Sequence, residues 1–238
     1  MTVLGIDISR WQLQTPSLDG LGFCFVKATE GATIDPLWNR HSADVRRAGI
    51  ILGAYAFGVD SLNGDTQAAC LLRTAPHADL YALDVEGPHA PQEAQVRAFG
   101  KAMHAAGRTW GLYGSQSGYP SWGQDWRWVA KWGPTSPDIR WEFWQRRGSP
   151  LDLDTFRGSL TDLHRLAKVA PPQLYRVVVN GTTPIYTHPD GTIIGHVSQA
   201  TYTCTRAMSG GHWWYHIKAG GKVRGYMPAE PWMEVTEL

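Results

Sequence analysis

Short apolar segments alternate with amphipathic segments over the first 167 residues of the chain. Eight apolar segments are rich in β-branched or aromatic residues and are bounded by Gly, Pro, Asp or Ser, which predicts strands. The expected strands are Val3–Ser9, Phe23–Gly31, Ile51–Gly58, Leu80–Gly87, Trp110–Gln116, Arg127–Gly133, Arg140–Arg147 and Leu151–Phe156. Because helical patterns separate several of them, the order favours an α/β fold, a (β/α) barrel. Connections 133–139 and 148–150 are too short for full helices, so we expect the barrel to be irregular on its later side.

Two of the intervening segments carry start and stop signals of helices. Asp35 and Pro36 predict an N-cap followed by a proline at the first helical position, and Gly49 predicts the end of that helix. Pro91 opens a second helical pattern, which Gly107 ends. Both helices have apolar side chains on one face, as expected for helices that cover a barrel.

The pattern changes at Ala170-Pro171-Pro172, beyond which no helical period is found. The expected strands there are Tyr175–Asn180, Pro184–Thr187, Gly195–Val197, Tyr202–Arg206, Trp213–Ile217 and Gly225–Pro228, separated by the turn signals Asn180-Gly181, Pro189-Asp190-Gly191 and Gly220-Gly221. Short strands of this kind predict a small all-β barrel. We therefore predict a first domain over 1–168, a proline-containing linker over 169–173 and a second domain over 174–238.

Composition excludes several classes of protein. The 22 Lys plus Arg nearly balance the 21 Asp plus Glu, and because phosphate affinity needs clustered basic residues, we expect no nucleic-acid partner. Hydrophobic residues at 43% and charged residues at 18% exclude a disordered chain and a coiled coil. The 12 Trp residues suggest a sugar-binding surface, with a Trp-rich core as the alternative. The candidate sugar platform is Trp122, Trp126, Trp128, Trp132, Trp141 and Trp144, of which some must be core.

Cysteine and histidine spacing predicts neither a disulfide framework nor a metal site. Cys24, Cys70 and Cys204 are widely spaced, and we expect Cys24 and Cys70 to be buried as small hydrophobic residues. His212 and His216 have H-x₃-H spacing, but no Cys pair or further acid completes a zinc site, so we expect solvated strand histidines. No phosphate loop or nucleophile elbow is present. We expect no cofactor and no metal.

The first residues, MTVLGIDIS, lack the basic and apolar regions of a Sec signal, and no segment reaches 18 uninterrupted apolar residues. We therefore expect a soluble protein that is made in a cytoplasm and does not insert into a membrane.

The segment Tyr81–Gly87 ends an apolar pattern with two carboxylates. On a strand, residues i and i+2 project to the same face about 6.5–7 Å apart, so Asp84 and Glu86 are expected to point together from the carboxyl end. Barrel enzymes place their chemistry at that end. Two close acids raise the pKa of one of them, which leaves a proton donor beside an anion. A capping Asp and a solvated Glu are the alternative.

Further acids occupy the ends of other expected strands. Asp7 ends the first, Glu30 ends the second, and Asp152 and Asp154 lie in the last. Acids near the same ends of several barrel strands converge in space. Paired carboxylates in an aromatic-lined cleft are the usual groups for cleaving a glycosidic bond.

Four segments resemble motifs of glycoside hydrolase family 25 muramidases and occur in the same order. They are Gly5–Gln12, Phe25–Gly31, Leu83–Glu86, and Trp144-Gln145 ahead of Leu151–Leu153. The resemblance runs over residues 1 to about 167. It implies a flattened, irregular (β/α) barrel that hydrolyses the β-1,4 bond between N-acetylmuramic acid and N-acetylglucosamine. By this resemblance, Glu86 matches the general acid/base, and Asp84, Asp7 and Asp152 match its acidic partners.

The candidate substrate-binding residues are Tyr55, Glu30, Lys27, Tyr113, Trp132, Trp144, Gln145 and Trp11. The chain departs from the family at Ala56, where His is frequent, and in the short span from Glu86 to Asp152. Both departures concern the shape of the cleft and leave the acids in place.

The tail resembles a bacterial SH3-like cell-wall-binding domain through its strand pattern, Pro189-Asp190-Gly191, and the aromatic run Trp213, Trp214 and Tyr215, which are the wall-binding candidates. A spacer or a dimerisation module is the alternative.

Together these features predict a two-domain peptidoglycan hydrolase whose partner is bacterial peptidoglycan and which acts as a monomer. The missing Sec signal fits a bacteriophage endolysin that leaves the host cytoplasm through a holin-type lesion. An exported, extracellular autolysin is the rival within this class. Two alternatives come from other classes, a chitinase-like hydrolase and a non-catalytic glycan-binding protein. The D-x-x-D-x-D-x-E pattern of chitinases is not met in this chain, and a non-catalytic protein has no reason to retain the four acids.

Overall fold

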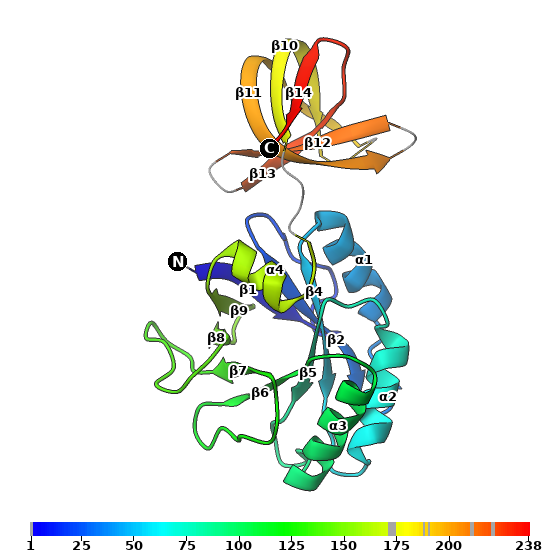
Figure 1. Ribbon diagram of the computed structural model, residues 1–238, viewed down its shortest axis with the longest axis vertical. Helices are drawn as coiled ribbons and strands as arrows, with labels where there is room; N and C mark the ends of the chain where they lie inside the picture. Colours follow the sequence, from blue (N-terminus) through cyan, green and yellow to red (C-terminus); the bar gives the residue numbers. More distant parts are fainter. Residues whose placement is uncertain (1, 171–174, 188, 190, 210–211, 220–221) are drawn as a thin grey trace. The chain divides into compact units, whose positions relative to one another are not determined.

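The computed structural model describes residues 2–170, 175–187, 189, 191–209, 212–219 and 222–238 (Figure 1). The chain divides into two compact units, Met1–Val169 and Ala170–Leu238. Of the predicted linker, residues 171–173 lie outside the described residues, as do parts of two predicted turns, at 190 and at 220–221. The two units are described separately below.

The first unit is built on a closed sheet. Its strands are β1 Thr2–Ile8, β2 Phe23–Glu30, β3 Thr33–Ile34, β4 Ile51–Phe57, β5 Leu80–Asp84, β6 Gly111–Ser115, β7 Trp126–Ala130, β8 Phe143–Arg147 and β9 Asp152–Arg157. They are ordered β1-β9-β8-β7-β6-β5-β4-β2-β3, and an additional pairing of β1 with β2 closes the barrel. The mixed α/β class and the closed barrel-like sheet are thus confirmed.

Strand β9 departs from a regular (β/α) barrel because it runs antiparallel to both of its neighbours, β8 and β1. The cause is the short connection from Arg147 to Asp152. A few residues can join antiparallel strands, whereas a parallel crossover needs a dozen or more. This reversal brings the start of β9, rather than its end, beside the carboxyl end of β1.

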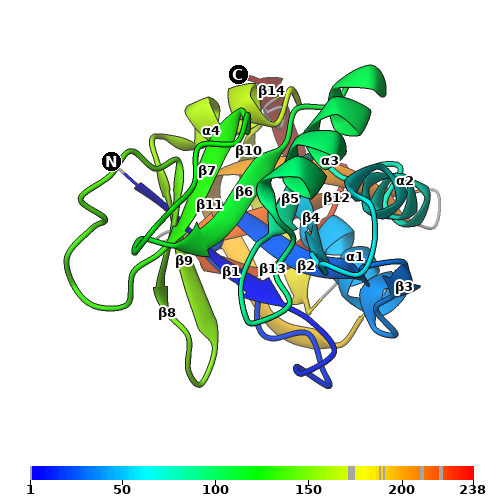
Figure 2. The same cartoon turned by 90° about the horizontal axis from the view of Figure 1, so that it is seen from below.

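The described residues of this unit form four helices, α1 Trp38–Ala48, α2 Gly64–Thr74, α3 Glu93–Ala105 and the short α4 Leu160–Leu166. Three of them, α1, α2 and α3, lie along one side of the barrel, whereas α4 lies against β1 (Figure 1). Figures 1 and 2 show α1, α2 and α3 beside β2, β4 and β5, whereas loops follow β6, β7 and β8. No helix is assigned within 116–125, 131–142 or 148–151. The expected irregularity of the later side is confirmed.

The start of α1 differs from the sequence prediction. The helix begins at Trp38, not at Pro36, because Asp35 Oδ1 accepts a hydrogen bond from Leu37 N at 2.9 Å and forms a turn ahead of the helix. Its end is as predicted: Gly49 has a φ of 66°, a left-handed conformation that glycine adopts without steric cost.

Aromatic rings fill the barrel interior. Phe25 stacks on Trp128 with ring centroids 4.3 Å apart, and Trp126 packs edge-on against Phe143 at 5.1 Å. Trp126 and Trp128 are fully buried, so these members of the predicted sugar platform are core residues. The other face of the strands packs against the helices, and Cys24 and Cys70 are buried as expected.

Three interior glycines provide room for these rings. A Cβ atom at Gly5, Gly53 or Gly111 lies within 3.0 Å of the ring of Phe23, Phe25 or Trp126, respectively. Each large ring therefore faces a position with no side chain on the neighbouring strand. The interior therefore holds these large rings only because glycine occupies the facing positions.

The second unit is all β. Its strands are β10 Tyr175–Tyr186, β11 Ile193–Ser209, β12 His212–Ala219, β13 Lys222–Pro228 and β14 Met233–Glu237, ordered β11-β12-β13-β10-β14 with an additional pairing of β11 with β10. The core includes Val177, Val179, Ile217 and Met227. The predicted all-β composition is observed, but its resemblance to an SH3-like domain stays a prediction.

The strand boundaries of this unit differ from the predicted ones. The first two predicted strands are one strand, β10, the next two lie within β11, and β14 was not predicted. Asn180-Gly181 is not a turn, because the register of β10 against β11 shifts between Val179 and Thr182. The ring of Trp232 lies over Gly181, and Asn180 N donates to Trp232 O at 3.3 Å. Because Gly181 has no side chain, the indole of Trp232 can pack directly against the backbone there.

We predict that Gly53→Ala destabilises the first unit by ~1–3 kcal/mol, because the added methyl group must displace the packed ring of Phe25. The free energy of unfolding in urea, followed by tryptophan fluorescence, measures the change. Gly114→Ala is the matched control, since a Cβ there meets its neighbours at 3.6 Å or more. If the two variants are equally stable, the packing of the Phe25 ring does not require glycine at position 53.

Candidate active site

Four of the predicted acids meet at one end of the barrel. Asp7 lies near the carboxyl end of β1, directly opposite Asp152 at the start of the antiparallel β9. Asp84 is the last residue of β5, and Glu86 follows it two residues beyond the strand. Asp7 and Asp84 are buried, whereas Glu86 is exposed. A buried acid and an exposed acid thus lie two residues apart at the end of one strand.

Gln145 on β8 connects three parts of this end of the barrel. Its Nε2 donates to Asp7 Oδ2 at 2.9 Å and lies 3.4 Å from Asp152 Oδ1. Its Oε1 accepts from the hydroxyl of Tyr113 at 2.8 Å and from Trp132 Nε1 at 3.2 Å. Since both ends of the amide have partners, its orientation is fixed. Gln145 and Tyr113, both predicted substrate-binding residues, therefore hold the acids in place.

Asp154 is a fifth acid of the cluster that the sequence did not assign to the site. It is fully buried, and Trp128 Nε1 donates to its Oδ1 at 2.7 Å. The alternation of Asp152 and Asp154 on one strand was the signal that could have identified it, because residues i and i+2 share a face.

Burial raises the pKa of the acids in this cluster. Burial, followed by the charges of Asp154 and Asp152, raises the pKa of Asp7 well above its usual range. Burial and then the charge of Glu86 do the same for Asp84. Mainly through burial, the pKa of Asp152 rises to about 6 and that of Asp154 to about 7. Close carboxyls with raised pKa values share protons near neutral pH, so some members of the group are protonated while others stay anionic.

Although the Glu86 side chain is exposed to solvent, partial burial of its carboxyl raises its pKa, and the charge of Lys27 opposes this shift. Lys27 is itself buried, lies 2.5 Å from Glu30 Oε2, and stands over the ring of Phe57 at 4.7 Å. Its hydrogen bond is the main cause that lowers the pKa of Glu30. Glu30 therefore forms an ion pair with Lys27, and the charge of Lys27 also acts on Asp84 and Glu86.

Tyr55 is buried in the barrel interior, with its ring edge-on to Trp128 at 5.8 Å. Burial, followed by the charges of Asp7 and Asp84, raises its pKa. Its hydroxyl therefore stays protonated beside the acids. Ala56, the departure from the family, packs in the cluster between barrel and helices.

The predicted aromatic surface is divided between exposed and buried rings. Trp11 and Trp132 are 76% and 71% exposed. Trp144 is buried, donates from Nε1 to Lys131 O at 2.6 Å and packs edge-on against Trp141. Trp144 therefore offers no open face for a sugar, and Trp11 and Trp132 are the rings of the predicted set that can stack on one.

In the second unit, Trp213 is partly exposed, whereas Trp214 and Tyr215 are buried. The guanidinium of Arg206 lies 4.2 Å from the ring centroids of both Tyr175 and Trp213. Of the three predicted wall-binding residues, Trp213 alone presents an exposed face, because it lies at the exposed start of β12, whereas Trp214 to Ile217 are all buried.

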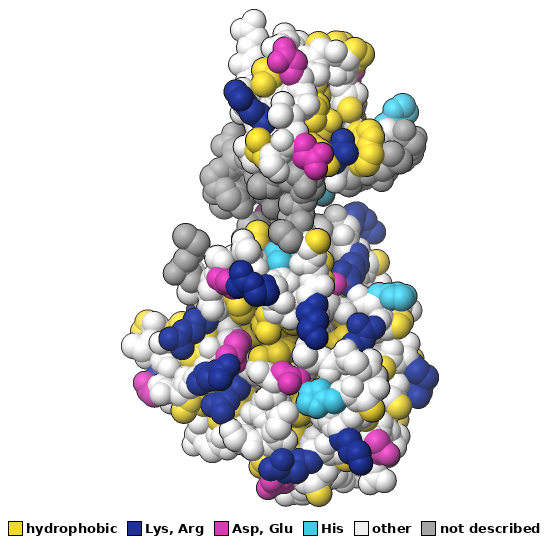
Figure 3. Space-filling model, in the orientation of Figure 1, with side chains coloured by type: hydrophobic (Ala, Val, Ile, Leu, Met, Phe, Trp, Pro, Cys, Tyr) yellow, Lys and Arg dark blue, Asp and Glu magenta, His cyan; other side chains and the backbone are white. Residues whose placement is uncertain are grey.

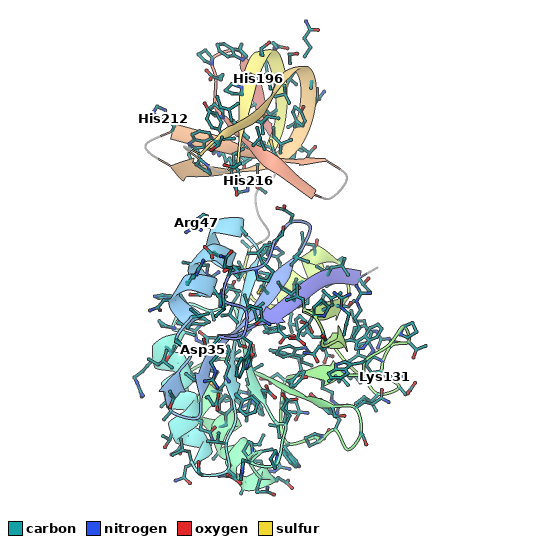
Figure 4. The ribbon with its side chains drawn as sticks, turned by 180° about the vertical axis from the view of Figure 1, so that it is seen from behind. Asp35, Arg47, Lys131, His196, His212 and His216 are labelled. Atoms are coloured by element: carbon teal, nitrogen blue, oxygen red, sulfur yellow. The ribbon has the colours of Figure 1, made fainter. Side chains whose placement is uncertain are left out.

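The histidines of this unit do not converge. Figure 4 shows His196, His212 and His216 at separate places. His216 is buried, with its ring 4.2 Å from that of Tyr226, so the expectation of a solvated histidine is wrong for this residue. Within the part of the chain that the structure describes, no group of three or more His, Cys, Asp or Glu has an arrangement suited to a metal ion.

The distribution of surface charge and the character of the helices bear on a charged binding face and on a membrane span. Lys, Arg, Asp and Glu side chains are interspersed on the face of the first unit shown in Figure 3. No helix among the described residues has the length and apolar character needed to span a bilayer.

Comparison with known proteins relates the first unit to glycan-cleaving enzymes. The model of Glycosyl hydrolases family 25 matches residues 6–149, which include Asp7, Asp84, Glu86 and Gln145 but not Asp152. The uncharacterized protein YegX of Escherichia coli is 31% identical over 202 residues, which cover 68% of this chain and 72% of the relative.

Solved structures show the same similarity. A bacterial lysozyme from Streptomyces coelicolor is 26% identical, with a TM-score of 0.59 over 69% of this chain and 96% of that one. A family 25 glycosyl hydrolase from Bacillus anthracis is 22% identical, with a TM-score of 0.59 over 69% and 93%, which shows a shared fold. The CTP1L endolysin is 20% identical, with a TM-score of 0.52 over 70% of each chain.

We predict that the raised pKa of Asp154, about 7, makes the first unit less stable as pH rises from 4 to 7. Between the unfolded pKa, near 3.9, and the folded value, the native state binds more protons, so the free energy of unfolding falls by up to ~1.4 kcal/mol per pH unit for one such group. Asp154→Asn removes the titration, while the Asn side-chain oxygen can still accept from Trp128. Its unfolding free energy in urea is expected to fall less between pH 4.5 and 7.5.

Asp138→Asn is the control for this prediction. Asp138 is exposed, and its hydrogen bond from Lys131 lowers its pKa, so it titrates below this range. The control is expected to keep the pH dependence of the original chain. An Asp154→Asn variant with an unchanged pH dependence contradicts the prediction.

Proposed function

Because the chain belongs to glycosyl hydrolase family 25, we propose that it is a muramidase that hydrolyses the β-1,4 bond between N-acetylmuramic acid and N-acetylglucosamine in peptidoglycan. The observation that carries this proposal is the set of acids Asp84, Glu86, Asp7 and Asp152 at the carboxyl end of β1 and β5. The similarity to a bacterial lysozyme supports the substrate.

Glu86 is proposed as the general acid/base. It is the exposed member of the cluster, so its carboxyl can reach a bound glycan, and its raised pKa favours the protonated form that donates to the leaving oxygen. After the bond breaks, the same carboxylate accepts a proton from the attacking water. The charge of Lys27 limits the rise of the pKa and so keeps the group able to release its proton.

The buried acids are proposed to stabilise the positive charge that develops on the sugar ring. Asp84 Oδ1 is buried and has no hydrogen-bond partner among the described residues, so no donor of the protein shields this oxygen from a bound sugar. Asp7 and Asp152 are held in place by Gln145. Carboxylates fixed in a dry environment stabilise an oxocarbenium-like transition state more strongly than solvated ones.

For the second unit we propose a wall-binding role. Its support is the exposed face of Trp213, whose ring packs against the Arg206 guanidinium. A wall-binding unit raises the effective concentration of the barrel at a polymeric substrate without changing the chemistry. Bacteriophage origin, release from a host cytoplasm and the monomeric state stay predictions.

We predict that Glu86→Gln lowers turnover on purified cell walls by ~10²–10⁴-fold, because the amide has the same shape but cannot donate or accept the catalytic proton. The release of reducing ends measures turnover, and thermal unfolding shows that the fold is retained. Glu93→Gln, on the exposed face of α3, is the matched control and is expected to clear walls normally.

Reduction of the products with borohydride, followed by sugar analysis, tests the bond assignment. N-acetylmuramic acid is the expected new reducing end. N-acetylglucosamine ends indicate a glucosaminidase or a chitinase-like specificity, and peptides released from intact glycan indicate an amidase or a peptidase. The absence of any cleavage indicates a glycan-binding protein.

We predict that Trp213→Ala in the full chain weakens co-sedimentation with intact walls, while the hydrolysis of soluble muropeptide oligomers stays unchanged. Loss of one stacked aromatic ring accounts for ~1–3 kcal/mol of binding in comparable interfaces, about a tenfold or greater change. Ile193→Ala, at another exposed apolar position on β11, is the control. Sedimentation of the Trp213→Ala chain as strong as that of the control favours a spacer or a dimerisation module.

A further inference from the structure

A pocket of about 520 Å³ lies beside the acids, between the loop after β7 and the turn that joins β8 to β9. Its walls include Trp132, Arg146, Arg147, Ser149 and Leu153. This volume falls within the range of small-ligand sites.

The pocket adjoins the acids through Trp132. One edge of the indole donates from Nε1 to Gln145 Oε1, and Gln145 in turn donates to Asp7. The six-membered ring of the same indole lies over Gly148, where a Cβ atom would be 2.5 Å from the ring. Trp132 therefore forms a wall of the pocket while it is hydrogen-bonded to the residue that holds the acids.

The pocket carries two positive charges, of which that of Arg146 also acts on the buried Asp154. In the described part of the chain, neither Arg146 nor Arg147 forms an ion pair, whereas Arg46, Arg97 and Arg165 each do so with a nearby carboxylate. Arg146 Nε is buried and has no hydrogen-bond partner there. Arg147 Nε is 3.4 Å from Leu151 O, and its side chain is exposed.

Buried donors without partners are costly, and a guanidinium presents a planar fork that matches a carboxylate. We propose that this pocket is an anionic subsite that binds a carboxylate carried by the substituent on the 3-oxygen of the sugar, and that it selects glycans bearing such a substituent over uncharged ones. The inference rests on the proposed function and deepens it. N-acetylmuramic acid carries such a lactyl substituent, free or extended by a peptide, and chitin carries none.

The placement also fits the glycosidic reaction. Trp132 offers an apolar face next to the two arginines, so one sugar can stack on the ring while its substituent reaches the guanidinium groups. The substituent thereby fixes which sugar lies over the acids. Arg146 and Arg147 act as specificity determinants and take no part in proton transfer.

Binding to the full chain carrying Glu86→Gln, measured by titration calorimetry, tests this subsite without turnover. The three ligands have equal glycan length: a tetrasaccharide of alternating N-acetylglucosamine and N-acetylmuramic acid with its stem peptides, the same glycan with free lactyl carboxylates, and chitotetraose. Arg147→Gln is added to this background because Arg147 is exposed and its replacement is compatible with folding. Arg73→Gln, which removes one positive charge from the exposed face of α2, is the matched control.

We expect Arg147→Gln to weaken binding of at least one carboxylate-bearing glycan by about tenfold relative to chitotetraose, the scale of a lost charge-assisted hydrogen bond. Arg147→Lys is expected to recover part of the loss, and Arg73→Gln to leave all three Kd values in place. The advantage of the carboxylate-bearing glycan over chitotetraose is expected to shrink as salt increases.

A loss confined to the peptide-bearing glycan assigns the subsite to peptide carboxylates, and a loss confined to the peptide-free glycan assigns it to the lactyl carboxylate. A loss with both supports a site that accepts either. Equal changes for all three ligands, or none, overturn the proposal. Failure of the proposed function is separate: a chain with carboxylate-selective binding but no cleavage of walls keeps the subsite and loses the muramidase assignment.

Discussion

Desolvation of carboxyl groups above an aromatic core is the constraint on which this site depends. Trp128 touches both features, since its ring stacks on Phe25 in the interior and its Nε1 donates to Asp154. The rings exclude water from beneath the acids, and burial is the largest cause of the raised pKa values of Asp7, Asp84 and Asp154. The packing that stabilises the barrel is thus also what prepares its acids for proton transfer.

The irregular half of the barrel contributes the parts of the site that the regular half does not. The short β8–β9 connection reverses β9 and places Asp152 opposite Asp7, where Gln145 can reach both. The same connection, together with the loop that carries Trp132, forms the arginine-lined pocket. Loops in place of helices therefore bring polar and charged side chains close to the acids on this side.

The family similarity is confined to part of the chain. The family match ends at residue 149, and the structural likeness covers about two thirds of the chain. The second unit stands on its own features, an all-β sheet with a core of aliphatic and aromatic residues and an exposed Trp213. The chemistry of the first unit and the wall-binding of the second are therefore separate proposals with separate tests.

Local patterns determined the strands of the first unit, the end of α1 at Gly49, and the acids Asp7, Asp84, Glu86 and Asp152, because period, turn residues and strand ends are properties of a few neighbouring residues. They were less reliable in the second unit, where a bulge at Asn180-Gly181 resembles a turn in sequence. The distinction depends on Trp232, which is about 50 residues away.

Which aromatic residues are core and which are exposed was decided only by the tertiary structure. Trp128 and Trp132 lie four residues apart, yet the first is sealed in the barrel and the second is open to solvent, since that difference depends on strands β2 and β8 packing around them. The role of Gln145, the inclusion of Asp154 and the position of the two arginines at the pocket likewise arise from contacts between distant segments. Sequence specifies which groups are available, and closure of the barrel determines which of them meet.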